Sequence, residues 1–153
     1  MALKGHRTER EDNIQFFMNE VGNRGGVVCV STGGSGISLD QSAALATYKA
    51  ASSGSKPLGL LLNDMVNVDL TRQHLNDHKD EVQIGSKITI SRKGCFVTDQ
   101  IVSGTTPAAG DGAYLGPAGM ITNLDTGAIA SPKVGQFLSA KDEDGYAEVS
   151  INL

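Results

Sequence analysis

Hydrophobic residues occur in short runs along most of the chain, and this pattern is typical of β-strands. VVCVS at 27–31 predicts a strand of the buried type, LGLLLND at 58–64 is a continuous apolar run, and MVNVDL at 65–70 alternates. VQIGSKITISRKGCFVTDQIV at 82–102 predicts two strands with a turn between them at Lys93-Gly94. We therefore expect a chain built mainly from short strands.

The last part of the chain predicts a hairpin. VGQFL at 134–138 and YAEVSI at 146–151 flank the polar KDEDG, in which Asp144-Gly145 is a strong turn signal. A shorter strand, AYL at 113–115, lies within a connection rich in Gly and Pro. Short strands at this spacing predict a small barrel or sandwich.

Polar and glycine-rich segments between these strands predict turns and loops. GGSG at 33–36 is interpreted as a turn, SSGSKP at 52–57 as a flexible loop, and TRQHLNDHKDE at 71–81 as a long loop or one helical turn. The Ala-rich residues 40–50 fit either a helical turn or an edge strand. A chain of 153 residues suits one compact domain, and we place a single β-rich domain at residues 27–153.

The first 26 residues differ from the rest and predict an N-terminal arm, residues 1–26. Thr8 followed by Glu11 fits a capping box. The apolar residues that follow have helical spacing and end at a glycine: Ile14, Phe17, Met18, Val21 and then Gly22. Two interpretations stay open: a short helix docked on its own core, or an arm, short helix or extended, whose apolar side chains rest on another subunit.

Composition and charge exclude several classes of function. The net charge of −4 argues against a general nucleic-acid binder, which needs a basic surface. No run approaches 18 apolar residues, so we expect no membrane span. The charged N-terminal sequence lacks the apolar stretch of a secretory signal, so we expect a protein that is made in the cytoplasm and not exported. Cys29 and Cys95 each lie in an apolar run, and we expect two buried, reduced thiols.

One pair of histidines has the spacing of metal ligands. His74 and His78 would share one face of a helix, and Asp80 lies close enough to serve as a further ligand or a base. The metalloprotease motif, however, needs Glu where this chain has Leu75. We favour a solvated polar loop, with an intersubunit polar contact as the alternative, and we expect no metal and no cofactor.

The other motifs of catalysis and ion binding are incomplete. No Lys follows the GGSG at 33–36, so that segment is not a phosphate-binding loop. The acidic run 142–145 resembles the middle of a calcium loop, but Ile151 stands where the bidentate Glu belongs. There is no G-x-S-x-G elbow, and neither cysteine has an adjacent histidine. We therefore expect a protein that is not an enzyme.

Long stretches of the chain resemble the head decoration (capsid cement) proteins of tailed bacteriophages. These stretches are LGLLLNDMVNVDLTRQHLNDHKDEVQIGSKITISRKGCFVTD at 58–99, VGQFLSAKDEDGYAEVSINL at 134–153, and the opening MALKGHRTEREDNIQFFMNEVGNRGGVV. The resemblance implies a non-enzymatic virion protein on the outer capsid surface. Such proteins bind the expanded shell at junctions between major capsid protein subunits, often as dimers or trimers. It also implies a mainly β fold, either a small β-barrel or a β-tulip-like domain.

A cement protein works through many shared weak contacts, because multivalent attachment gains affinity through effective concentration. Aromatic and Arg side chains dominate the binding energy of interfaces. We therefore predict intersubunit or capsid contacts within the N-terminal arm, at Arg7, Arg10, Phe16, Phe17, Met18 and Arg24. The competing interpretation is that the two Phe side chains complete the core of their own subunit.

Three other functions compete with capsid cementing. The first is a different virion module, in a tail or fibre. The second is a metal-dependent hydrolase that uses His74, His78 and Asp80. The third is a β-barrel that binds a small ligand.

Overall fold

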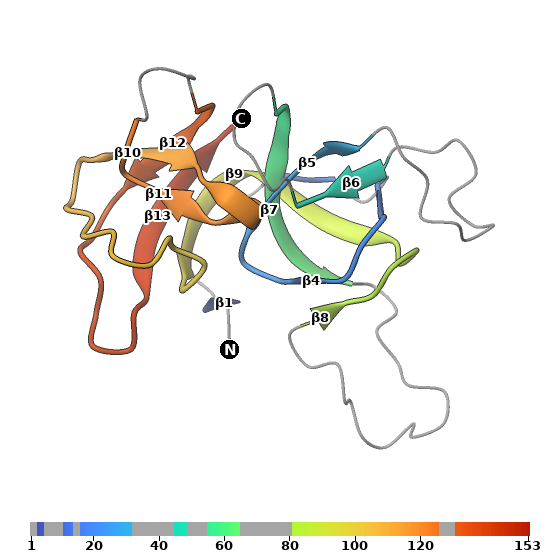
Figure 1. Cartoon of the computed structure of the whole chain (residues 1–153), viewed down its shortest axis with the longest axis horizontal. Coiled ribbons are helices and arrows are strands. Elements are labelled where there is room, and N and C mark those ends of the chain that lie inside the picture. Colours follow the sequence, from blue (N-terminus) through green and yellow to red (C-terminus); the bar gives the residue numbers. More distant parts are fainter. Residues whose placement is uncertain are drawn as a thin grey trace.

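The protein is mainly β in the computed structural model, which describes residues 3–4, 11–13, 16–31, 45–48, 55–64, 81–125 and 131–153 (Figure 1). The strands are β1 (Leu3–Lys4), β2 (Glu11–Asn13), β3 (Phe17–Met18), β4 (Gly22–Asn23), β5 (Val27–Ser31), β6 (Leu45–Thr47), β7 (Pro57–Asp64), β8 (Glu81–Val82), β9 (Ile88–Thr98), β10 (Gly112–Leu115), β11 (Ile121–Thr122), β12 (Lys133–Phe137) and β13 (Ala147–Asn152). A short 3₁₀ helix, η2 (Pro117–Gly119), precedes β11.

Most of these strands belong to one large mixed sheet. Its order is β11-β10-β12-β13-β9-β7-β5-β6-β3, and β1 and β2 also pair with β9. β3 and β6 run parallel, whereas the other pairs are antiparallel. β4 and β8 form a separate two-stranded ribbon. The mainly β prediction is confirmed, but the described strands do not close into the expected small barrel, because their order ends at β11 and at β3.

The half of the sheet that ends at β3 nevertheless curls back toward β9. The N–H of Met18 donates to the carbonyl of Ser86 at 3.0 Å, and the N–H of Ile88 donates to the carbonyl of Phe16 at 3.0 Å. A single bridge also joins Phe17 to Lys87, just before β9 begins. The outer edge of β3 is therefore hydrogen bonded through isolated contacts and not through a continuous strand pairing.

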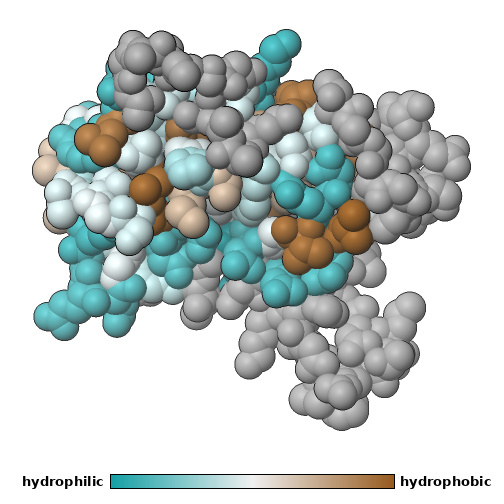
Figure 2. All heavy atoms as spheres, viewed as in Figure 1, coloured by the Kyte–Doolittle hydropathy of each residue, from teal (hydrophilic) through white to brown (hydrophobic). Residues whose placement is uncertain are grey.

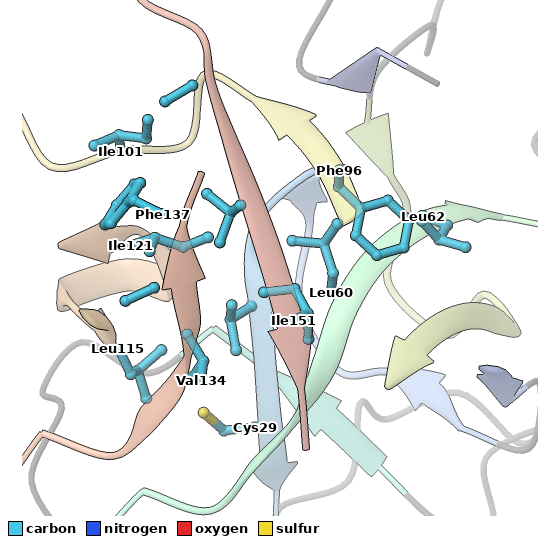
Figure 3. Close-up of a cluster of buried hydrophobic side chains, with 14 residues drawn as sticks. Cys29, Leu60, Leu62, Phe96, Ile101, Leu115, Ile121, Val134, Phe137 and Ile151 are labelled. Atoms are coloured by element: carbon cyan, nitrogen blue, oxygen red, sulfur yellow. The ribbon is translucent and has the colours of Figure 1, made fainter. Parts of the chain in front are cut away.

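β5 and β7 form a wall between two hydrophobic cores. Side chains of a strand alternate between its faces, and here both faces are buried. Val27 and Leu60 enter a first core, which they share with β9 to β13 (Figure 3). Val28 and Leu61 enter a second core, which they share with β3, β6, β8 and β9. This double burial accounts for the unbroken apolar runs in the two strands.

β9 connects the two cores, and the turn predicted at Lys93-Gly94 is wrong. The strand runs through both residues: its first half pairs with β7 and its second half with β13. Gly94 has a φ of 148°, a conformation that favours glycine and lets the strand bend without ending. Ile90 thus lies in the second core and Phe96 in the first.

The predictions of the other strands have mixed outcomes. Those at 27–31, 58–64 and 113–115 and the closing hairpin are confirmed as β5, β7, β10 and the β12–β13 pair. Within the Ala-rich segment, 45–47 is a strand and not a helical turn. Cys29 is buried as expected, but Cys95 is only half-buried, because it points away from the core that holds its neighbour Phe96.

The helix predicted near the N-terminus is wrong for the described part of that segment. Residues 11–13, 17–18 and 22–23 are strands, and those of β2 and β3 gain backbone partners from β9 and β6. These pairings satisfy N–H and C=O groups that an isolated short helix would leave open at its ends. The turn at 33–36, the strand at 65–70 and nearly all of the loop at 71–81 lie outside the described residues.

The wall predicts that neighbouring leucines are equally important although they face opposite cores. We expect Leu60→Ala and Leu61→Ala each to lower the free energy of unfolding by about 2–5 kcal/mol, because each leaves a cavity among fully buried side chains. Val30→Ala, at an exposed position near the end of β5, should cost less than about 1 kcal/mol. Urea denaturation measures all three. A negligible loss for either leucine variant would contradict the two-core arrangement.

Candidate functional site

The predicted contact residues that the structure describes lie in and around β3 and β4. Met18 is fully buried in the second core, and Phe16 packs against that core while partly exposed. Phe17, between them, is half-buried and belongs to neither core. Arg24 is half-buried directly after β4. Arg7 and Arg10 lie outside the described residues.

Two exposed hydrophobic side chains stand next to these residues. Val21 precedes β4 and is 52% exposed, and Ile84 follows β8 and is 40% exposed. The antiparallel pairing of Gly22 with Val82 brings the two segments together. The N–H of Gly85 donates to the carbonyl of Met18 at 2.7 Å, which places the turn that carries Ile84 beside β3.

We call Phe17, Val21 and Ile84 the apolar patch. Figure 2 shows hydrophobic side chains on this face, among them a group over the region of β4 and β8. Charged residues of both signs lie beside the patch. Lys87 forms an isolated β-bridge with Phe17, and Glu81 pairs with Asn23 in the β4–β8 ribbon. A small apolar centre with a charged rim is the usual anatomy of a protein-binding surface.

A partly buried tyrosine, Tyr48, holds the β4 side of the patch in place. The ring of Tyr48 lies against Gly22, Gly26 and Gly119, and a Cβ atom at any of these glycines would collide with it. Its hydroxyl donates a hydrogen bond to the backbone carbonyl of Asn23 in β4. The tyrosine therefore ties the β4 segment, which carries Val21 into the patch, to β5 and to η2.

The surroundings of this tyrosine also favour its neutral form. Burial raises the pKa of Tyr48 above its usual range, and the negative charge of Glu20 adds to the effect. The same Glu20 carboxylate accepts hydrogen bonds from the hydroxyl of Thr47 and, at 2.5 Å, from the N–H of Tyr48. Glu20 thus fixes the end of β6 against the segment between β3 and β4.

A polar groove lies elsewhere, on the β12–β13 hairpin. Its volume is about 380 Å³, and its lining consists of Lys133, Gly135, Gln136, Ser150 and Asn152. Among the described residues that line it there is no carboxylate, imidazole or thiol, so these residues offer no pair of groups for acid–base or nucleophilic catalysis. Within the described ranges, no three His, Cys, Asp or Glu side chains gather into a metal site. His74, His78 and Asp80 lie outside those ranges.

Sequence patterns indicate only part of this arrangement. The sequence indicates an apolar group in the N-terminal segment, formed by its aromatic residues and Val21. Nothing in the sequence around Ile84, within the polar VQIGSK, indicates that this side chain is exposed. Tyr48 stands in the Ala-rich segment, and nothing in its neighbours indicates that three distant glycines form its socket. Among the described residues, no helix is long and apolar enough to cross a membrane.

Tyr48 should control the stability of this region and its response to alkali. Tyr48→Phe removes the hydrogen bond to Asn23 and should cost about 1 kcal/mol, whereas Tyr48→Ala empties the socket and should cost about 3–5 kcal/mol. A raised pKa in the folded state means that stability is complete below the unfolded value, about 10, and is lost as pH rises above it. The free energy of unfolding of wild type should therefore fall more steeply above pH ~10 than that of Tyr48→Phe. Parallel pH profiles would contradict this assignment.

Comparison with known families identifies the chain. The family model described as "Structural cement protein (E217 gp24/Pam3 gp6)" matches residues 4–152, nearly the whole chain. No curated protein sequence matches it. The chain belongs to this family of phage structural cement proteins, so it is a structural protein of the virion and not an enzyme.

Proposed function

We propose that this cement protein binds the outer surface of the expanded phage capsid at junctions between major capsid protein subunits. It holds neighbouring subunits together and thereby stabilises the shell. The family assignment supports a structural role in the virion. The location and the contact surface are our proposal.

The apolar patch is the observation that carries this proposal. Val21 and Ile84 remain 52% and 40% exposed although the chain buries large apolar side chains on both faces of its central strands. Phe17 lies on the outward side of β3, because Met18 beside it enters the core. Exposed apolar side chains on neighbouring segments are a favourable place for a partner to bind.

The energy available from the patch suits a protein that binds in many copies. Burying the exposed half of Val21 and of Ile84 yields about 1 kcal/mol each. Together this is about 2 kcal/mol, or about 30-fold in affinity. Such a contribution is modest for one copy, but it adds up over a shell on which every copy bridges subunits.

The charged rim supplies orientation rather than most of the affinity. Lys87 and Glu81 are exposed beside the patch, and Arg24 is half-buried at its margin. Charges of both signs around an apolar centre select the partner and its register. We propose that Arg24 and Phe17 contact the capsid directly, whereas Met18 acts from within the second core by supporting β3.

Capsid binding should fail when the patch becomes charged. We expect the double variant Val21→Asp/Ile84→Asp to bind expanded, undecorated heads of the parent virus about tenfold more weakly or worse, because desolvating carboxylates in an apolar contact is costly. Co-sedimentation with the heads, quantified against the major capsid protein, measures the occupancy.

Leu124→Asp is the matched control, because Leu124 is 62% exposed and lies outside the patch, after β11. It should pellet with heads as wild type does. Circular dichroism and thermal melting of both variants verify that they are folded. Wild-type occupancy by a folded Val21→Asp/Ile84→Asp variant would contradict the proposed contact surface.

A further inference from the structure

We propose that copies of this protein associate head to tail, with the acidic loop between β12 and β13 of one copy seated in the polar groove of the next. The groove and the loop lie at opposite ends of the same hairpin. Neither belongs to the apolar patch, so this contact is independent of the surface proposed to bind the capsid.

The groove is built to receive an anionic group. Lys133 and Gln136 are exposed on β12, and Ser150 and Asn152 line the groove from β13. They supply an ammonium group, two amides and a hydroxyl, and no carboxylate is among them. The Gln136 amide already donates one hydrogen bond, to the carbonyl of Gly110 at 2.8 Å, so one N–H of this amide remains for a partner. A volume of about 380 Å³ lies at the small end of ligand sites, so it suits the tip of a loop.

The shape of the groove depends on one glycine. β12 has an irregular register opposite β10 between Ala113 and Tyr114, which is where Gly135 lies. A Cβ atom at Gly135 would run into the backbone carbonyl of Ser150. The two backbones are therefore in contact, and the floor of the groove is peptide backbone between longer side chains.

A second cation stands beside the groove. Lys93 of β9 is exposed and pairs across the ladder with Asn152, which lines the groove. The neighbouring Arg92 lies 3.5 Å from the carbonyl oxygen of Leu153, so we do not assign it to the groove. Glu11 of β2 pairs with Lys93 from the other side, so Lys133 is the cation of this end that the groove itself presents.

The other end of the hairpin presents the complementary charge. Asp142, Glu143 and Asp144 are all exposed in the loop that joins β12 to β13. The Asp142 carboxylate accepts hydrogen bonds from the N–H of Tyr146 at 2.7 Å and of Asp144 at 3.1 Å. Asp142 is therefore occupied in holding the loop, and Glu143 and Asp144 are the side chains that it offers to a partner.

The loop has a fixed shape, which lowers the entropic cost of binding. The N–H of Asp142 donates to the carbonyl of Tyr146 at 2.8 Å, and the N–H of Gly145 donates to the carbonyl of Asp142 at 3.0 Å. Gly145 adopts a φ of 86°, which other residues rarely adopt. The loop is thus a closed, hydrogen-bonded projection and not an open connection.

The positions of the two surfaces decide the kind of assembly. Figure 1 shows the loop between β12 and β13 at one end of β13 and the C-terminus at the other end of this strand. One copy therefore cannot place its loop in its own groove. A contact between unlike surfaces of identical chains is heterologous, and its repetition closes a ring or extends a chain.

Such a contact is weak and sensitive to salt, because both surfaces are exposed and charged. In solution we expect association only at high protein concentration. On a capsid, where copies are held close together, the effective concentration reaches the millimolar range and the same contact becomes occupied. The proposal thus places self-association after, or together with, capsid binding.

Charge reversal and mixing test the proposal without any capsid. Sedimentation velocity of wild type, at concentrations up to about 1 mM in low salt, should show association. This association should weaken as NaCl rises toward 0.5 M, because the screening length there is roughly fourfold shorter than at 0.03 M. Lys133→Glu in the groove and Glu143→Lys/Asp144→Lys in the loop should each weaken association about tenfold or more. All three sites are exposed, and circular dichroism verifies folding.

The decisive sample is an equimolar mixture of the two variants. The loop of the Lys133→Glu chain is intact, and so is the groove of the Glu143→Lys/Asp144→Lys chain. In addition, the basic loop of the second chain is complementary in charge to the acidic groove of the first. A head-to-tail contact therefore predicts that the mixture regains the association that each variant alone has lost. Lys56→Glu, which reverses an exposed charge immediately before β7, should associate as wild type does.

Three results would overturn the proposal. These are a wild type that stays monomeric at about 1 mM in low salt, variants that associate as wild type does, and a mixture that remains monomeric. None of them bears on capsid binding through the apolar patch, which is measured separately with heads.

Discussion

The burial of both faces of β5 and β7 is the constraint on which the rest of the structure depends. In many antiparallel sheets one face is exposed to solvent, but here successive residues of the same strand enter different cores. Val27 and Leu60 stabilise the half of the protein formed by β10 to β13, and Val28 and Leu61 stabilise the half that includes β3 and β8. The two halves therefore share one wall, and the functional surface of each half is positioned by the same pair of strands.

Close backbone packing then fixes the surfaces themselves. Tyr48 packs on three glycines and joins the β4 segment to β5 and η2. A movement of this side of the apolar patch would therefore pull the ring out of the space between the glycines. In the other half, Gly135 brings β12 against β13 and leaves the groove open. Aromatic side chains are few in this chain, and glycines are many. Contact between backbones and one well-placed ring replaces some of the bulk that larger side chains would supply.

Local sequence patterns predicted the strands whose burial is simple and failed where distant partners decide. VVCVS and LGLLLND contain unbroken apolar runs because both faces are buried over most of each strand. The Asp144-Gly145 signal marked the closing hairpin correctly. Lys93-Gly94 has the residues of a turn, but β13 pairs with this segment and β2 reaches Lys93, so the strand continues. Ile14, Phe17, Met18 and Val21 have helical spacing, yet the pairing of β3 with β6, remote in sequence, makes Phe17 and Met18 a strand. Exposure is also a property of the whole fold, so no local pattern distinguished the buried Met18 from the exposed Ile84.

The chemical difference between the two proposed surfaces suits the order in which a cement protein meets its partners. An apolar patch gains from burial at any ionic strength, so it is the better surface for a lasting contact with the shell. A charged loop and groove attract one another weakly and remain hydrated when apart, so they keep copies soluble before attachment. Once the patch holds copies side by side, the effective concentration of loop and groove rises without any change in their intrinsic affinity. If instead the self-association contact were apolar and the capsid contact charged, copies would associate before they met a capsid. Because the contact is heterologous, they would then polymerise in solution. The separation of an apolar patch on β3, β4 and β8 from a polar hairpin on β12 and β13 thus lets the capsid itself determine where a network of cement protein forms.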